Sequence, residues 1–141
     1  MKKTQRFLIW SILTLATIFD ARSYTIPNQL IVLGYLAGLM TNLTCQGIKG
    51  IAHFLLMATW PIGLLMLLYL CGKSMGAGDI KLFSVMATLV GVSATVKTFV
   101  LSVFLAGITI VAISLKDGQL LRRKLHYSYY MTTAFFCLQC I

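Results

Sequence analysis

The sequence is short of acidic side chains. It has 12 lysines and arginines but only three acids, Asp20, Asp79 and Asp117, and it has no glutamate. Charged residues make up 11% of the 141 residues, whereas 59% are hydrophobic. A water-soluble domain of this length needs far more polar surface to cover its core. The composition therefore argues against a soluble globular enzyme and indicates a protein that crosses a membrane several times.

Disulfide frameworks and metal-ligand patterns are also missing. Cys137 and Cys140 form a single CxxC near the end of the chain, while Cys45 and Cys71 stand alone. Neither of the two histidines has the spacing that would complete a zinc site with them. We therefore expect no metal site, and we interpret the cysteines as small apolar side chains.

The net charge of +9 raises the question of nucleic acid. The basic residues, however, are scattered at the ends of apolar segments and form no basic stripe or basic–aromatic array. Attraction to anionic lipid and the setting of membrane topology explain them better. We expect a lipid bilayer as a partner and no nucleic acid.

Apolar runs separated by short polar breaks predict the fold class. We expect an all-α, polytopic membrane helix bundle of about six transmembrane helices, forming a single domain over residues 1–141. The runs cover residues 7–19, 30–43, 51–70, 82–92, 98–115 and 127–141. A helix that crosses about 30 Å of hydrocarbon needs about 20 residues, so several runs must be extended by their flanks. Those flanks contain Asp20 and Asp79, whereas Asp117 is predicted to lie in a solvated loop.

Counting the crossings predicts where the two acids meet. Asp20 ends the first predicted span and Asp79 begins the fourth, and the two spans between them make one round trip. Both carboxyl groups should therefore emerge on the same face of the membrane. Seven basic residues fall on that face and five on the other, which favours a cytoplasmic position by the positive-inside rule. The basic N-terminus argues for the opposite orientation.

Purely structural roles are available for these residues. Asp79 can serve as the N-cap of the following helix, and Asp20 can pair locally with Arg22. Pro27 fits the first turn of the second span, where its missing N–H costs nothing, and Asn28 can satisfy free backbone groups nearby. Arg22 can instead hold phosphate headgroups or tune Asp20.

A chemical role explains the acids together. Two carboxyl groups held close cannot easily both ionise, so one keeps its proton beside a carboxylate base, as acid–base peptide hydrolysis requires. Gly76 and Gly78 lack β-carbons and would permit positive φ and the close approach of an extended substrate. Lys81 lies about 200° around a helix from Asp79, so we expect it mainly to anchor the helix at the interface.

These residues form a pattern that resembles the type IV prepilin peptidase family of intramembrane aspartic proteases. Asp20 closes the first span and Arg22 follows, Ile26-Pro27-Asn28 opens the second, and a GxGD motif followed by Ile80-Lys81 opens the fourth. The resemblance covers residues 7–115 and implies that Asp20 and Asp79 are the catalytic pair, with Gly76 and Gly78 shaping the site. It implies no metal or organic cofactor.

The resemblance also implies a substrate and a location. Members of this family remove the short basic leader from type IV prepilins or pseudopilins at the cytoplasmic face of the bacterial plasma membrane. Only six residues precede the first apolar run, so we expect the short, peptidase-only type that accompanies tight-adherence pili, without methyltransferase activity. The sequence does not indicate an oligomeric state.

Two other functions remain open. The acids could form the relay of a proton- or cation-coupled carrier, although both lie at span ends and no internal repeat is visible. Alternatively, the chain could be a non-catalytic scaffold of a pilus or secretion assembly, with the acids only capping helices.

Overall fold

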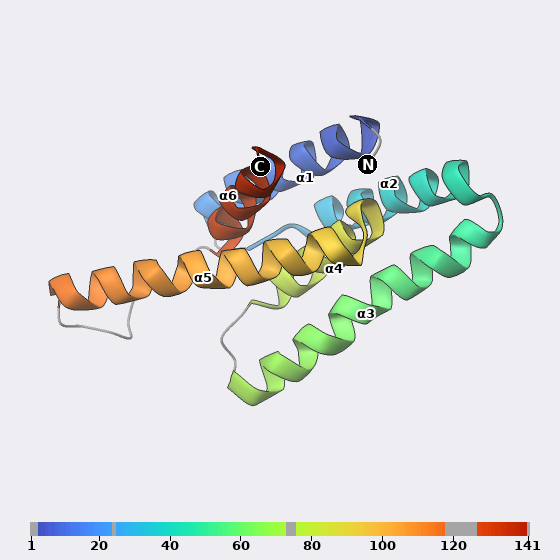
Figure 1. Cartoon of the computed structure of the whole chain (residues 1–141). Helices are drawn as coiled ribbons and strands as arrows, with labels where there is room; N and C mark the ends of the chain where they lie inside the picture. The colour runs from blue at the N-terminus through green and yellow to red at the C-terminus, as the bar shows by residue number, and fades with distance from the viewer. Residues whose placement is uncertain (1–2, 24, 73–75, 118–126, 141) are drawn as a thin grey trace.

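The computed structural model describes residues 3–23, 25–72, 76–117 and 127–140, and within them it contains six helices and no strand (Figure 1). The helices are α1 (Lys3–Ser23), α2 (Asn28–Gln46), α3 (Lys49–Gly72), α4 (Ala77–Val90), α5 (Val92–Asp117) and α6 (Tyr127–Cys140). The prediction of an all-α bundle is therefore confirmed.

The helix boundaries differ from the predicted runs in an instructive way. The run 82–92 crosses a break, because α4 ends at Val90 and Gly91 adopts a φ of 86° before α5 begins. The predicted loop position of Asp117 is wrong, since α5 continues to this residue. Between the end of the run 98–115 and Asp117 there is no glycine or proline, so nothing in the sequence ends the helix before this residue.

Helix α4 is the centre of the bundle and contacts α1, α2, α3 and α5. Every residue from Leu82 to Leu89 is buried. An apolar helix that is covered on all sides is typical of a core position. Its 14 residues extend only about 21 Å at 1.5 Å per residue, less than the hydrocarbon thickness of a bilayer.

Two glycines let α2 lie directly on α4. A β-carbon built on Gly34 would collide with Val85, and one built on Gly38 would collide with Thr88. The two glycines stand four residues apart on one face of α2, the spacing that brings helix backbones together inside membranes. Close packing of α2 on α4 thereby fixes the N-terminus of α4 against the N-terminus of α2.

A group that we call the amide cluster joins α2, α3 and α4. It consists of Asn42, His53 and Thr88. The Asn42 side-chain amide donates to the carbonyl oxygens of Gly38 at 2.7 Å and of Thr88 at 2.9 Å. Its oxygen lies 2.9 Å from His53 Nδ1, which must donate because an amide oxygen only accepts. The cluster therefore satisfies both ends of the buried amide internally.

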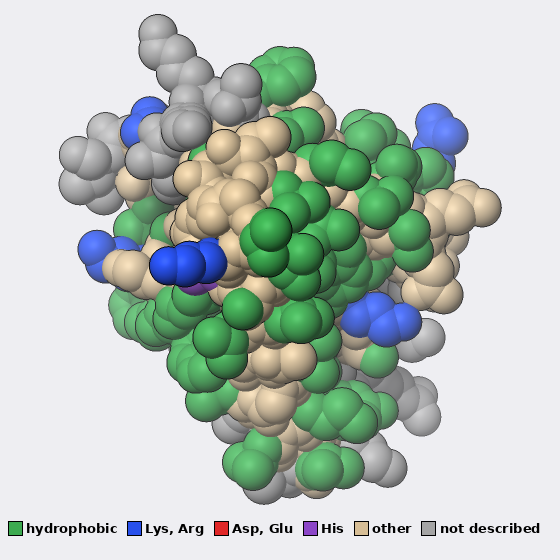
Figure 2. All heavy atoms as spheres, turned by 90° about the vertical axis from the view of Figure 1, so that its right-hand side faces the viewer, with side chains coloured by type: hydrophobic (Ala, Val, Ile, Leu, Met, Phe, Trp, Pro, Cys, Tyr) green, Lys and Arg blue, Asp and Glu red, His purple; other side chains and the backbone are tan. Residues whose placement is uncertain are grey.

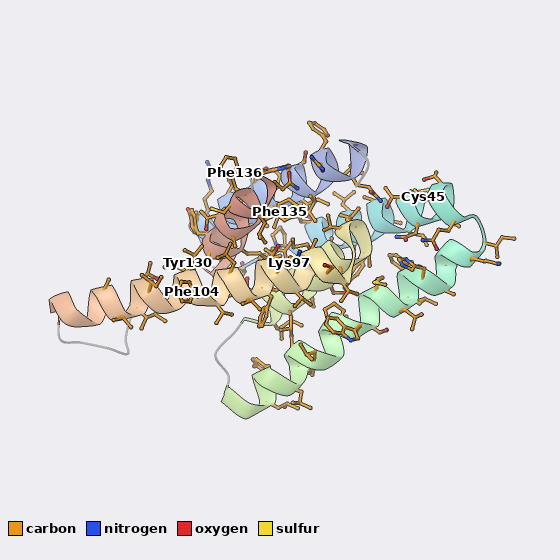
Figure 3. All side chains as sticks on the ribbon, in the orientation of Figure 1. Cys45, Lys97, Phe104, Tyr130, Phe135 and Phe136 are labelled. Atoms are coloured by element: carbon orange, nitrogen blue, oxygen red, sulfur yellow. The ribbon has the colours of Figure 1, made fainter. Side chains whose placement is uncertain are left out.

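Helix α6 is anchored on both α1 and α5 (Figure 1). Thr109 Oγ1 on α5 donates to the Tyr130 hydroxyl at 2.9 Å. On the other side, the Trp10 ring of α1 lies 5.9 Å from the ring of Phe135 and 5.4 Å from that of Phe136, and Figure 3 labels these α6 side chains. Residue 141 of the predicted last run lies outside the described residues.

The outer surface of the bundle is strongly apolar. Figure 2 shows hydrophobic side chains covering much of one face, with few lysines and arginines between them. Eight large apolar residues of α3 alone are exposed: Ile51, Leu55, Leu56, Trp60, Leu64, Met66, Leu67 and Leu70. Within the described residues, two segments are long and apolar enough to cross a membrane, Lys49–Leu67 and Val92–Ala112. The other four predicted crossings stay predictions.

Candidate active site

Asp20 and Asp79 meet in one pocket. The pocket has a volume of about 270 Å³ and lies where the C-terminal end of α1 approaches the N-termini of α2 and α4. It is lined by Asp20, Thr25, Ile26, Asn28, Gly76, Ala77, Gly78, Asp79 and Lys81. The predicted convergence of the two carboxyl groups is therefore confirmed, and six of the eight residues singled out from the sequence line this pocket.

Asp20 lies in the last turn of α1 and is only 9% exposed. Its Oδ2 accepts a hydrogen bond of 2.6 Å from Ser128 Oγ on α6. Arg22 is exposed and does not line the pocket, because two residues along a helix turn its side chain about 200° away from Asp20. The local pairing of Asp20 with Arg22 is thus replaced by a contact with a distant helix.

Asp79 lies in the first turn of α4 but is not the N-cap. The N-cap is Gly76, and the Asp79 carboxylate folds back to accept the backbone N–H of Gly76. This is half of a capping box, in which the third helical residue bonds to the N-cap amide. The positive end of the helix dipole also favours a negative group at this position.

The environment of Asp79 nevertheless favours its neutral form. Asp79 lies at the pocket, outside both segments that are long enough to cross a membrane. Burial, with a smaller contribution from the charge of Asp20, raises the pKa of Asp79 from 3.8 to about 6, and the hydrogen bond from Gly76 opposes this shift. The pair therefore has one carboxyl group that keeps its proton in weakly acidic solution.

The two glycines act through space rather than through unusual backbone angles. The expectation of positive φ is wrong, because Gly76 has φ −72° and Gly78 is helical. A β-carbon on Gly76 would lie 3.1 Å from Asp79 Oδ2, whereas one on Gly78 would make an ordinary contact of 3.5 Å with Ile26. Gly76 therefore makes room for the folded-back carboxylate.

Lys81 and Asn28 form the rim of the pocket. Lys81 Nζ donates to Asn28 Oδ1 at 3.1 Å, and this bond links the N-terminal ends of α2 and α4. Asn28 thus bonds a side chain rather than the free backbone groups predicted for it, and Lys81 lines the site. Pro27 occupies the N-cap of α2, one residue before the first turn, because its ψ of 134° is extended rather than helical.

Sequence reasoning missed the contribution of α6. Ser128 donates to Asp20, and its neighbour Tyr127 shares a hydrogen bond of 2.7 Å with Ser102 on α5. No local sequence pattern marks these residues, because their position depends on how α6 returns to α1.

The chemistry available at the pocket is that of two carboxyl groups. Among the described residues, no group of three His, Cys, Asp or Glu side chains is placed to hold a metal ion. The pair combines a carboxyl group of raised pKa with a second, hydrogen-bonded one, beside a space that several water molecules or a peptide segment can enter. This arrangement can transfer protons to and from a bound carbonyl and a water molecule.

Comparison with known proteins identifies the family. Residues 7–111 match the type IV leader peptidase family, and this range contains every residue that lines the pocket. Searches of curated proteins and of solved structures give no match. Since the matched range covers well over half of the chain, the chain is a peptidase that belongs to the type IV leader peptidase family.

Proposed function

We propose that this protein is an aspartic endopeptidase of the bacterial plasma membrane that removes the basic leader from type IV prepilins or pseudopilins. The catalytic pair would be Asp20 and Asp79. The observation that carries the proposal is that two of only three acids in the chain, contributed by different helices, line the same pocket. Family membership supports leader cleavage in general terms.

The reaction follows from two carboxyl groups that hold one proton between them. One ionised carboxylate takes a proton from water as the water oxygen bonds to the scissile carbonyl carbon. The protonated partner gives its proton to the carbonyl oxygen, which produces a neutral gem-diol. When the carbon–nitrogen bond breaks, the leaving nitrogen receives the proton taken from water, and a diol hydroxyl returns a proton to the other carboxylate. The pair ends as it began.

The surface of the bundle supports a membrane location. Exposed apolar side chains cover α3 and α5, and a hydrocarbon environment removes the cost of exposing them to water. We propose that the pocket opens toward the cytoplasm, because the face predicted to carry the two acids also carries the cluster Arg122, Arg123 and Lys124.

Substrate capture would depend on apolar contacts. A net charge of +9 gives a basic leader no overall attraction to this protein. The substrate's apolar helix can instead pack against the exposed apolar helices while its leader reaches the pocket. This arrangement would place the scissile bond at the boundary between leader and helix.

Cleavage in a defined membrane tests the proposal. The purified protein, reconstituted in lipid vesicles, is incubated with a prepilin precursor, and the products are identified by mass spectrometry. We expect cleavage by the wild type and by Asp117→Asn, which keeps both Asp20 and Asp79, but not by Asp20→Asn or Asp79→Asn. Cleavage that survives in either pocket variant would contradict the proposal. Proton flux without cleavage would instead favour the carrier.

A further inference from the structure

Ser128 occupies a special position in the first turn of α6. It is completely buried, and its hydroxyl donates to Asp20 Oδ2 over 2.6 Å. That distance is at the short end of the range for O–H···O hydrogen bonds. The bond joins the last helix to the first, and Ser128 lies beyond residue 111, where the family match ends.

The two carboxyl groups of the pocket therefore have different surroundings. Asp20 is buried and receives a hydrogen bond of 2.6 Å from the Ser128 hydroxyl, which fixes the orientation of its carboxyl group. Asp79 receives a bond from the Gly76 amide, but burial and the charge of Asp20 outweigh it. This difference is what a proton-transferring pair needs, because its members must perform opposite tasks at the start of the reaction.

We propose that Ser128 is a positioning residue that holds Asp20 as the proton acceptor of the pair and leaves Asp79 as the proton donor, a role that rests on the peptidase function proposed above. Asp20 then takes the proton from the attacking water. Asp79 gives its proton to the scissile carbonyl oxygen. As the carbon–nitrogen bond breaks, Asp20 passes the proton from water to the leaving nitrogen, and Asp79 recovers one from the gem-diol.

Among the residues that the structure describes, few other groups surround Asp20. Helix α1 packs against α2, α4 and α6. From α4, Asp79 and Lys81 share the pocket with Asp20, and from α2 the uncharged Asn28 does. From α6, Tyr127 stands next to Ser128, and its hydroxyl shares a hydrogen bond with Ser102. A change at Ser128 therefore acts on Asp20 without altering any charged group.

The test compares serine variants of the full-length protein in lipid vesicles, using prepilin cleavage over a range of pH. Ser128→Ala should lower kcat about tenfold while KM stays within about twofold, since the change affects proton transfer rather than binding. The acidic limb of the pH–rate profile should also move to higher pH, because the acceptor loses its donor. Ser128→Thr, which keeps the hydroxyl, should return the limb to its original position, and Ser128→Cys, a weaker donor of similar size, should lie between.

Ser84→Ala is the matched control. Ser84 is also completely buried and has two hydrogen bonds, to Tyr35 and to the Ala58 carbonyl, but it lies away from the pocket. The Ser84→Ala protein should be less stable, but the acidic limb of its pH–rate profile should stay in place. The role of Ser128 would be overturned if the acidic limb of the pH–rate profile stayed in place in Ser128→Ala, or if it moved equally in Ser84→Ala. This holds even if the wild type cleaves and Asp20→Asn does not. Cleavage by Asp20→Asn would instead overturn the peptidase function itself.

Discussion

The bundle contains two groups of polar side chains among its apolar helices, and they are built differently. In the amide cluster, both ends of the Asn42 side chain are bonded within the protein, to His53 and to the carbonyls of Gly38 and Thr88. In the pocket, Asp20 and Asp79 face a space of about 270 Å³, and the charge of one disfavours the charge of the other.

This difference indicates that the amide cluster has a structural role and that the pocket has a chemical one. A buried polar group whose hydrogen bonds are all internal fixes how helices meet, and it has no atom left for a substrate. Two carboxyl groups that oppose each other's ionisation cost stability, and they retain a proton that can be transferred. We therefore expect changes in the amide cluster to affect folding and changes in the pocket to affect turnover.

The largest expected effect is in the pocket. Asp20→Asn and Asp79→Asn should each reduce the rate of prepilin cleavage by roughly 10³-fold or more, because each removes one half of the proton transfer. The double variant should be no slower than either single variant, since the two groups act as one unit. Initial rates of all four proteins measure this, and losses that multiply in the double variant would show that the two groups act independently.

The amide cluster should respond in the opposite way. Asn42→Ala leaves the Thr88 carbonyl and the His53 ring without their partner, which should cost about 2 kcal/mol of unfolding free energy. Thr41→Ala is the control, since the Thr41 hydroxyl only bonds the Gly38 carbonyl of its own helix. Denaturant unfolding in micelles measures both. A loss of turnover in fully folded Asn42→Ala would weaken the distinction between the two groups.

Substitutions of the two glycines of the GxGD motif should have different effects on kcat. Gly76→Ala places a methyl group 3.1 Å from Asp79 Oδ2 and should reduce kcat about tenfold by moving the carboxylate. Gly78→Ala meets Ile26 at 3.5 Å and should reduce kcat by less than about threefold unless the substrate itself passes over this position. Steady-state kinetics compare the two, and a larger loss at Gly78 would point to a substrate contact.

The smallest expected effect is the pH dependence of stability. The folded protein holds a proton on Asp79 up to about pH 6, whereas the ordinary pKa is 3.8, so stability falls as the pH rises between these values. The cost is complete above about pH 6 and absent below 3.8. Asp79→Asn should therefore raise the melting temperature at pH 7.5 by a few degrees and by much less at pH 4. Equal shifts at both pH values would contradict this.

Much of the fold could be predicted because apolar runs in this sequence indicate where its helices lie. Within the described residues, every run except 82–92 falls on a single helix, and the ends of α1 and the start of α4 extend into polar residues that hydropathy leaves out. The spacing of Gly34 and Gly38 is the sequence signal that indicates the contact of α2 with α4. Gly91 was likewise an available break, which the apolar residues on both sides concealed.

The site could be predicted only in part. Counting crossings brought Asp20 and Asp79 together, because each crossing reverses the direction of the chain whatever the packing. The bond from Ser128 to Asp20 could not be found in this way, since it depends on the angle at which α6 packs on α1. The true partner of Asn28, which is Lys81, depends on packing as well.

The scarcity of acids offers the most direct measurement of the central claim. With three aspartates and no glutamate, a protein labelled with ¹³C at the aspartate carboxyl carbon gives three side-chain signals. In a pH titration by NMR, we predict that one signal titrates near pH 6, that it disappears in Asp79→Asn, and that its midpoint falls in Asp20→Asn as the neighbouring charge is removed. Three independent titrations near pH 4, with none changed by loss of the other pocket acid, would contradict the shared proton on which the proposed peptidase chemistry depends.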